Sequence, residues 1–174
     1  MRLAVAVTAD DHAQGPPDAP FVLVQYGDYE CPYTRRSLRE VDVVRAELGA
    51  GLRWVFRNYP LTEIHPHALH ASEAAEAAGA QGRFWEMHAV LFEHQKALED
   101  EDLQRYAVEV GLDGDAFAAD LAGGVHLDRI RADLDGGVRS GVGGTPTFFV
   151  NGLRHDGSYS GSELVSALRA TSTG

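Results

Sequence analysis

The first third of the chain shows a strand–helix–strand pattern of hydrophobic positions. Residues 21–26 form an almost continuous apolar run, which is typical of a strand covered on both faces of a sheet. From Pro32 to Leu48 the apolar residues recur every three or four positions, and glycines then end the predicted helix. A second strand is expected over 52–57. Two such strands joined by a helix predict a parallel pair with a right-handed crossover.

The opening of the chain alternates between apolar and small residues. Leu3, Val5 and Val7 follow this alternation, which is typical of a strand with one buried face. Read as a signal peptide, the same stretch is short, with only about seven apolar residues. We therefore expect a strand here and a cytoplasmic protein, with a polar, turn-rich connector over 10–20.

The middle of the chain, from about residue 65 to residue 140, carries no strand pattern. Its apolar periodicity, alanine content and glycine breaks predict a series of helices instead. The expected helices cover residues 68–80, 84–95, 102–110 and 115–121, with a longer one through 127–134.

The C-terminal part predicts a hairpin and a helix. Strand patterns at 147–150 and 153–155 flank Asn151-Gly152, a strong hairpin signal. Ser160 and Glu163 have capping-box spacing at the start of the last helix. The order of elements predicts an α/β fold, in which β-α-β and β-β-α halves form one four-stranded mixed sheet and the middle helices form an insertion.

Charge and cysteine content narrow the function. The formal net charge of −11 argues against a nucleic acid or an anionic membrane as partner, although Arg35, Arg36 and Arg39 form a local basic cluster. The single cysteine excludes an internal disulfide and a cysteine-rich zinc site, and it fits a reducing compartment.

Cys31 lies where the first predicted helix begins. Unpaired N–H groups and the positive end of the helix dipole favour an anion at such a position, and a thiolate is one. Pro32 suits the first helical position because its missing N–H would have had no partner there. The alternative is that Cys31 is a small buried hydrophobic residue, as most free cysteines are.

Two segments resemble the signatures of the DsbA-like thioredoxin-fold family of thiol–disulfide oxidoreductases. Residues 26–34, Tyr-Gly-Asp-Tyr-Glu-Cys-Pro-Tyr-Thr, resemble the active-site segment, where the family has Cys-Pro-x-Cys. Residues 144–152 resemble its cis-proline loop, and the resemblance covers nearly the whole chain. It implies one DsbA-like domain over 1–174, with thioredoxin-like parts at about 1–62 and 141–174 and a helical insertion at about 63–140.

The resemblance also implies roles for individual residues. Cys31 matches the nucleophilic cysteine, and Pro146 matches the cis-proline that faces it. The backbone of Thr145 would pair with the extended backbone of a bound peptide or glutathione. Pro32 and Tyr33, inside the motif, would help to bind the substrate.

Two departures from the family pattern limit this comparison. Thr34 replaces the resolving cysteine, and its hydroxyl is too weakly acidic to attack a mixed disulfide, although it can donate a hydrogen bond to the Cys31 thiolate. An engineered Cys→Thr change is the alternative origin of Thr34. Gln25 stands where many relatives carry a buried acid, and a neutral amide cannot act as a base.

Nearby charged residues are candidates for lining the site. Glu30 would oppose a thiolate at Cys31, unless it is simply a solvated surface charge. His65 is expected to line the active-site face or, alternatively, to begin a helix. His65, His67 and His70 resemble a metal cluster, but nothing completes a familiar zinc site, so we expect no metal.

The sequence therefore favours a monothiol oxidoreductase. Cys31 would form a mixed disulfide with a thiol- or disulfide-containing protein or small molecule, and an external thiol would resolve it. No bound cofactor is expected, and glutathione or another low-molecular-weight thiol is a possible co-substrate. The alternatives are a binding module that uses the same fold without redox turnover, and a glutathione-conjugating or isomerising enzyme.

Overall fold

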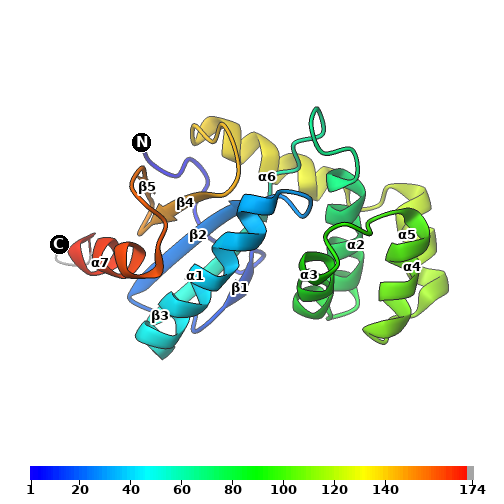
Figure 1. Ribbon diagram of the computed structural model, residues 1–174, viewed down its shortest axis with the longest axis horizontal. Helices are drawn as coiled ribbons and strands as arrows, with labels where there is room; N and C mark the ends of the chain where they lie inside the picture. The colour runs from blue at the N-terminus through cyan, green and yellow to red at the C-terminus, as the bar shows by residue number, and fades with distance from the viewer. Residues whose placement is uncertain (172–174) are drawn as a thin grey trace.

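The centre of the molecule is a mixed five-stranded sheet. The computed structural model describes residues 1–171, and the strand order is β1-β3-β2-β4-β5 (Figure 1). β2 and β3 are parallel, and every other neighbouring pair is antiparallel. The strands are β1 (His12–Gln14), β2 (Phe21–Gly27), β3 (Leu52–Asn58), β4 (Thr147–Val150) and β5 (Leu153–His155). The expected α/β architecture is confirmed, and the sheet has one strand more than the four that the sequence predicted for it.

The helices lie where the hydrophobic pattern predicted them, with some ends shifted by a few residues. They are α1 (Pro32–Leu48), α2 (Ala68–Ala80), α3 (Phe84–Glu93), α4 (Asp100–Glu109), α5 (Gly114–Gly123), α6 (Leu127–Arg139) and α7 (Gly161–Thr171), with a 3₁₀ turn η1 (Gly49–Gly51) after α1. None of the described helices is both long enough and apolar enough to cross a membrane.

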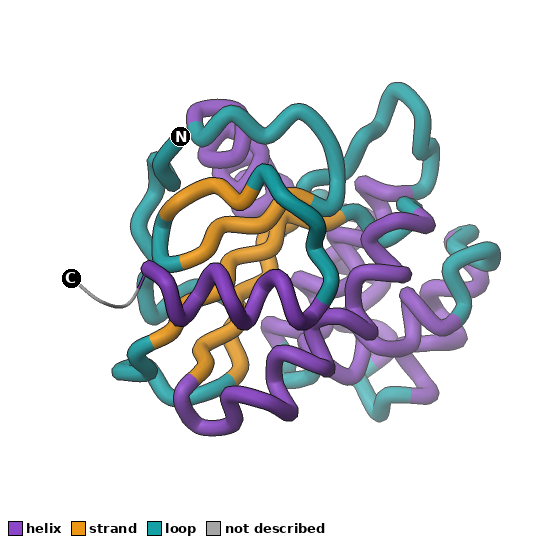
Figure 2. Tube along the Cα trace, turned by 60° about the vertical axis from the view of Figure 1, so that its left-hand side comes forward, coloured by secondary structure: helices purple, strands orange, loops and turns teal. Residues whose placement is uncertain are grey.

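Helices cover both faces of the sheet (Figures 1 and 2). Leu23 and Phe56 belong to the larger hydrophobic core, which also includes residues of α1, α7, α2 and α3. Val24 and Val55, on the opposite face, pack in a smaller core with Leu134 of α6. Helices α2 to α5 pack on one another beside the sheet. Burial on both faces explains why the central strands read as continuous apolar runs.

The N-terminal segment corrects one expectation. Leu3 and Val7 pack into the smaller core, but the segment is not a strand, and its only ladder contact is an isolated bridge from Arg2 to Leu153 among the described residues. The carbonyl groups of Val5 and Ala6 accept hydrogen bonds from the Arg57 guanidinium. Because a buried guanidinium needs acceptors, these carbonyls serve Arg57 rather than a neighbouring strand.

The fifth strand lies in the segment that we expected to be a connector. β1 pairs antiparallel with β3, with His12 opposite Phe56. Gly15 follows it with φ of 97°, and a Cβ at this position would lie 1.9 Å from the Leu52 carbonyl oxygen. Only glycine permits such a turn and such a close approach. A three-residue edge strand is too short to produce a readable alternation.

The capping box predicted for α7 is half formed. The Ser160 hydroxyl accepts a hydrogen bond from the Glu163 amide at 3.4 Å. The reciprocal bond from Glu163 is replaced, because the Ser160 amide donates to the Ser158 hydroxyl. The next amide, of Gly161, donates to the Glu40 carboxylate of α1 at 2.7 Å. A tertiary contact thus adds to the local contacts that cap this helix.

Candidate active site

Cys31 is the N-cap residue of α1, directly after the loop that leaves β2. Its Sγ donates a hydrogen bond to the Thr145 carbonyl oxygen at 3.3 Å, and the Thr145–Pro146 peptide bond is cis. The residue is 3% exposed, so the sulfur is largely covered. The fold therefore brings together Cys31 and the Thr145–Pro146 loop, 114 residues apart in sequence.

Gly27, the last residue of β2, allows the Phe56 ring and the Thr34 methyl group to pack closely against the backbone. A Cβ at this position would lie 2.4 Å from the Phe56 ring and 2.9 Å from the Thr34 methyl group. Pro32 occupies the start of α1 as expected, and both Pro32 and Tyr33 are exposed beside the buried sulfur. Tyr33 is 56% exposed, and the Arg36 guanidinium lies 5.5 Å from its ring centre. Exposed aromatic surface therefore lies within two residues of Cys31 in the sequence.

The buried carboxylate of Asp28 organises the loop before Cys31. Its Oδ1 accepts the Glu30 amide at 2.7 Å, and its Oδ2 accepts both the Leu61 amide and His65 Nδ1 at 2.8 Å. The Cys31 amide in turn donates to the Asp28 carbonyl at 3.1 Å. Asp28 thus joins the β2–α1 loop to the β3–α2 loop. The sequence analysis assigned Asp28 no role, although an aspartate side chain that can accept a hydrogen bond from the backbone two residues later is a known turn signal.

Gln95, after α3, is a second residue that sequence analysis missed. Its Nε2 donates hydrogen bonds to the carbonyl oxygens of Tyr29 and Cys31, at 2.8 and 2.9 Å. The helical insertion therefore directly supports the backbone of the cysteine. No local pattern could reveal this, because Gln95 lies 64 residues from Cys31.

Thr34 does not make the hydrogen bond to Cys31 that we expected. Its side chain is fully buried, and its hydroxyl accepts the Asp28 amide at 3.4 Å. Within the described chain, no hydrogen bond joins it to Cys31, whose sulfur is directed to the Thr145 carbonyl instead. Thr34 thus stabilises the loop that precedes the cysteine.

Gln25 takes part in a neutral buried network behind α1. Its Oε1 accepts the Trp54 Nε1–H at 3.2 Å, and its Nε2 donates to the Ser37 hydroxyl at 2.9 Å. The Ser37 hydroxyl donates onward to the Thr34 carbonyl at 2.7 Å. Every hydrogen bond in this network joins neutral groups. A neutral amide at position 25 therefore fits where many relatives carry a buried acid.

Each of the three clustered histidines lies beside a different carboxylate. His65 binds Asp28, as described above. His67 Nδ1 lies 2.9 Å from Glu30 Oε1, and His70 Nδ1 lies 2.6 Å from Asp100 Oδ1. The hydrogen bond to Glu30 raises the pKa of His67. Glu30 is therefore paired with His67. The three histidines, which are close in sequence, each contact a different carboxylate.

The aromatic residues of α3 support the site from within. His88 Nδ1 is 3.0 Å from the Tyr29 hydroxyl, and the Phe92 ring lies 4.8 Å from the Tyr29 ring, between centres. Burial lowers the pKa of His88 to about 3 and raises that of Tyr29, so both are neutral at physiological pH. This packing holds the Tyr29 backbone, which also receives the Gln95 hydrogen bond.

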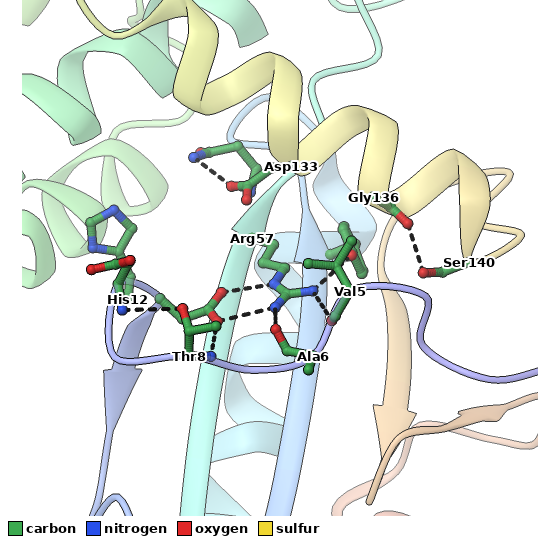
Figure 3. Close-up of polar contacts among 12 residues, drawn as sticks. Val5, Ala6, Thr8, His12, Arg57, Asp133, Gly136 and Ser140 are labelled. Carbon is green, nitrogen blue, oxygen red and sulfur yellow. Dashed lines mark hydrogen bonds and ion pairs between the residues drawn. The ribbon is translucent and has the colours of Figure 1, made fainter.

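A second polar cluster lies on the α6 side of the sheet (Figure 3). The Arg57 guanidinium is in contact with both carboxylate oxygens of Asp11 at 2.8 and 3.0 Å. Asp133 Oδ2, from α6, accepts the Asn58 amide at 2.9 Å, and Asn58 Nδ2 donates to Glu76 Oε1 at 2.7 Å. Burial raises the pKa of Asp133 to about 6. These contacts anchor the end of β3. The chain then continues into the β3–α2 loop, where Leu61 and His65 bind the Asp28 carboxylate.

Comparisons with solved structures agree with this architecture. A thioredoxin-like oxidoreductase from Silicibacter pomeroyi DSS-3 is 26% identical, with a TM-score of 0.84 over 96% of this chain and 95% of that one. BdbD from Bacillus subtilis is 19% identical, with a TM-score of 0.83 over 94% of each chain. The thioredoxin-like α/β fold, shared with DsbA-like oxidoreductases, is confirmed.

Curated relatives are larger proteins. The Na⁺/H⁺ antiporter NhaA 1 of Salinispora arenicola is 47% identical over 175 aligned residues, which cover 100% of this chain and 27% of the antiporter. NhaA 1 of Mycobacterium sp. strain KMS is 46% identical, over 92% of this chain and 26% of the antiporter. The chain thus spans about a quarter of the length of these relatives.

Family membership follows from the match along the chain. Residues 7–170 match the thioredoxin family, a range that contains both the Cys31 segment and the Thr145–Pro146 loop. With the sheet, the helices and the paired loops arranged as described, the chain belongs to the thioredoxin family.

Proposed function

We propose that this chain is a thiol–disulfide oxidoreductase that acts through Cys31 alone. The observation that carries the proposal is the position of the Cys31 sulfur, at the N-terminus of α1 and 3.3 Å from the Thr145 carbonyl. Helix N-termini favour anions, and the thiolate is the form of cysteine that attacks a disulfide. The exposed Pro32 and Tyr33 and the Thr145–Pro146 loop are the groups that would contact the substrate.

The reaction consists of two thiol–disulfide exchanges. The Cys31 thiolate attacks one sulfur of a disulfide, which forms a mixed disulfide with Cys31 and releases the other sulfur as a thiolate. An external thiolate then attacks the mixed disulfide, takes over the substrate sulfur and regenerates the Cys31 thiolate. Thr34 cannot replace the external thiol, because a hydroxyl is not deprotonated at neutral pH. Glutathione or another low-molecular-weight thiol is the co-substrate that we propose.

The direct test is turnover of a glutathionylated peptide in excess glutathione, with Cys31→Ser as the inactive variant. The wild-type protein is expected to release the peptide thiol catalytically, and mass spectrometry should detect glutathione on Cys31. The same turnover by the wild-type protein and by Cys31→Ser would refute the proposal.

A second candidate is a binding module without redox turnover. The absent resolving cysteine and the identity of 46–47% to part of proteins named as antiporters favour this alternative. The partner would then be a membrane antiporter, contacted through the surface around Tyr33 and Pro146. Binding to the detergent-solubilised antiporter of the same host should then be unchanged in Cys31→Ser, and a loss of binding in this variant would refute it.

A further inference from the structure

We propose that a basic pocket beside Cys31 binds a carboxylate of an anionic low-molecular-weight thiol while the sulfur of that thiol exchanges with Cys31. This inference rests on the proposed function and names the class of co-substrate. The pocket lies between the first turn of α1 and the turn that follows α3. It has a volume of about 270 Å³ and is lined by Arg35, Glu93, His94, Gln95, Lys96 and Ala97.

The pocket adjoins the reacting residue through a shared backbone group. The Cys31 carbonyl oxygen accepts Gln95 Nε2–H at 2.9 Å and the Arg35 amide at 3.2 Å. Gln95 and Arg35 both line the pocket. A ligand that contacts either residue in the pocket therefore lies next to a residue that hydrogen-bonds to the Cys31 backbone.

The cations of the pocket have no acidic partner. Arg35 and Lys96 are exposed, and neither side chain forms a hydrogen bond or an ion pair with another described residue. The only acid in the lining is Glu93, so the pocket carries an excess of positive charge. Among the other exposed arginines, five have carboxylate partners, namely Arg45, Arg83, Arg105, Arg131 and Arg169. Four have no such partner among the described residues, namely Arg2, Arg36, Arg39 and Arg139.

This arrangement selects for an anion. The chain as a whole has a net charge of −11 and therefore repels anions at long range, so a local pair of free cations is needed to attract one. Arginine binds carboxylates with two parallel hydrogen bonds, and lysine adds a point charge. A cavity of about 270 Å³ accommodates part of a small molecule.

The test compares an anionic thiol with a neutral one. Cys31 is first converted to its mixed disulfide with 2-thiopyridine. A thiol RSH that attacks the Cys31 sulfur forms Cys31–S–S–R, breaks the original S–S bond and leaves its proton on the released thiopyridone, whose absorbance gives the rate. Glutathione is the anionic probe and 2-mercaptoethanol is the neutral one.

Arg35→Ala and Lys96→Ala should each lower the glutathione rate by about threefold to tenfold, because each removes one partly exposed charged contact. The 2-mercaptoethanol rate should change less than about twofold, and Lys96→Arg should retain the glutathione rate. Salt should reduce the difference between the two thiols, since it screens exposed charges.

Arg131→Ala is the matched control, because it removes one exposed positive charge on α6 outside the pocket. An equal loss of the glutathione rate in this control would contradict carboxylate binding in the pocket. Equal losses of the glutathione and 2-mercaptoethanol rates in the pocket variants would contradict it as well. A glutathione rate that neither pocket substitution changes would also overturn the proposed carboxylate binding. The proposed function would still stand in that case, provided that the wild-type protein exchanges with both thiols. Absence of exchange with either thiol in the wild-type protein would refute both.

Discussion

Replacement of Asp133 by asparagine should stabilise the protein at neutral pH and much less in acid. Burial raises the pKa of Asp133 from 3.8 to about 6, so the folded state holds this proton more tightly than the unfolded state. The stability from this difference is fully present below about pH 4 and is lost as the pH rises through about 6. The asparagine side chain would keep an oxygen acceptor for the Asn58 amide but could not ionise.

The magnitude follows from the two pKa values. A change from 3.8 to about 6 corresponds to about 3 kcal/mol across the full titration. Between about pH 4.5 and about pH 7.5, the wild-type protein should lose about 2 kcal/mol of this contribution, and the variant should lose none of it. The titration of other groups is common to both proteins and largely cancels in the comparison.

Urea unfolding followed by tryptophan fluorescence measures this difference at each pH. The free energy of unfolding of Asp133→Asn, relative to wild type, should rise by about 2 kcal/mol from about pH 4.5 to about pH 7.5. Asp135→Asn, at an exposed position of the same helix, is the matched control and should show no such rise. A pH-independent difference for Asp133→Asn would refute the reasoning.

Three further predictions concern the loop around Cys31. Thr34→Cys should create a Cys-Pro-Tyr-Cys site that releases its mixed disulfide without an external thiol, which single-turnover release of a labelled peptide would detect; an unchanged need for glutathione would contradict this. Gln95→Ala should reduce the free energy of unfolding by about 1–3 kcal/mol, because two carbonyl groups lose a donor, and it should alter the rate of Cys31 alkylation; an unaltered rate would remove Gln95 from the positioning of the cysteine. Asp28→Ala should cost about 3 kcal/mol or more in urea unfolding, because several donors lose a buried acceptor, and Asp28→Asn should cost less; equal costs for the two variants would contradict a role in hydrogen bonding.

The sequence by itself determined the order and type of most elements. Hydrophobic periodicity is a local property, and the strands predicted at 21–26 and 52–57 and the helix predicted at 68–80 can be read from neighbouring residues alone. The position of Cys31 is also local, because a strand, a short loop and a proline at a helix start determine it. The resemblance over 144–152 then pointed to the loop that meets the cysteine.

Only the tertiary structure decided which groups are paired around these elements. Val5 and Ala6 look like strand residues until Arg57 binds their carbonyl groups. Gln95 is an ordinary loop residue until the insertion brings it to the Cys31 backbone. These hydrogen bonds join atoms separated by tens of residues, and packing rather than local pattern brings those atoms together. For this reason the elements were predictable from the sequence, whereas the groups that hold Cys31 in place were not.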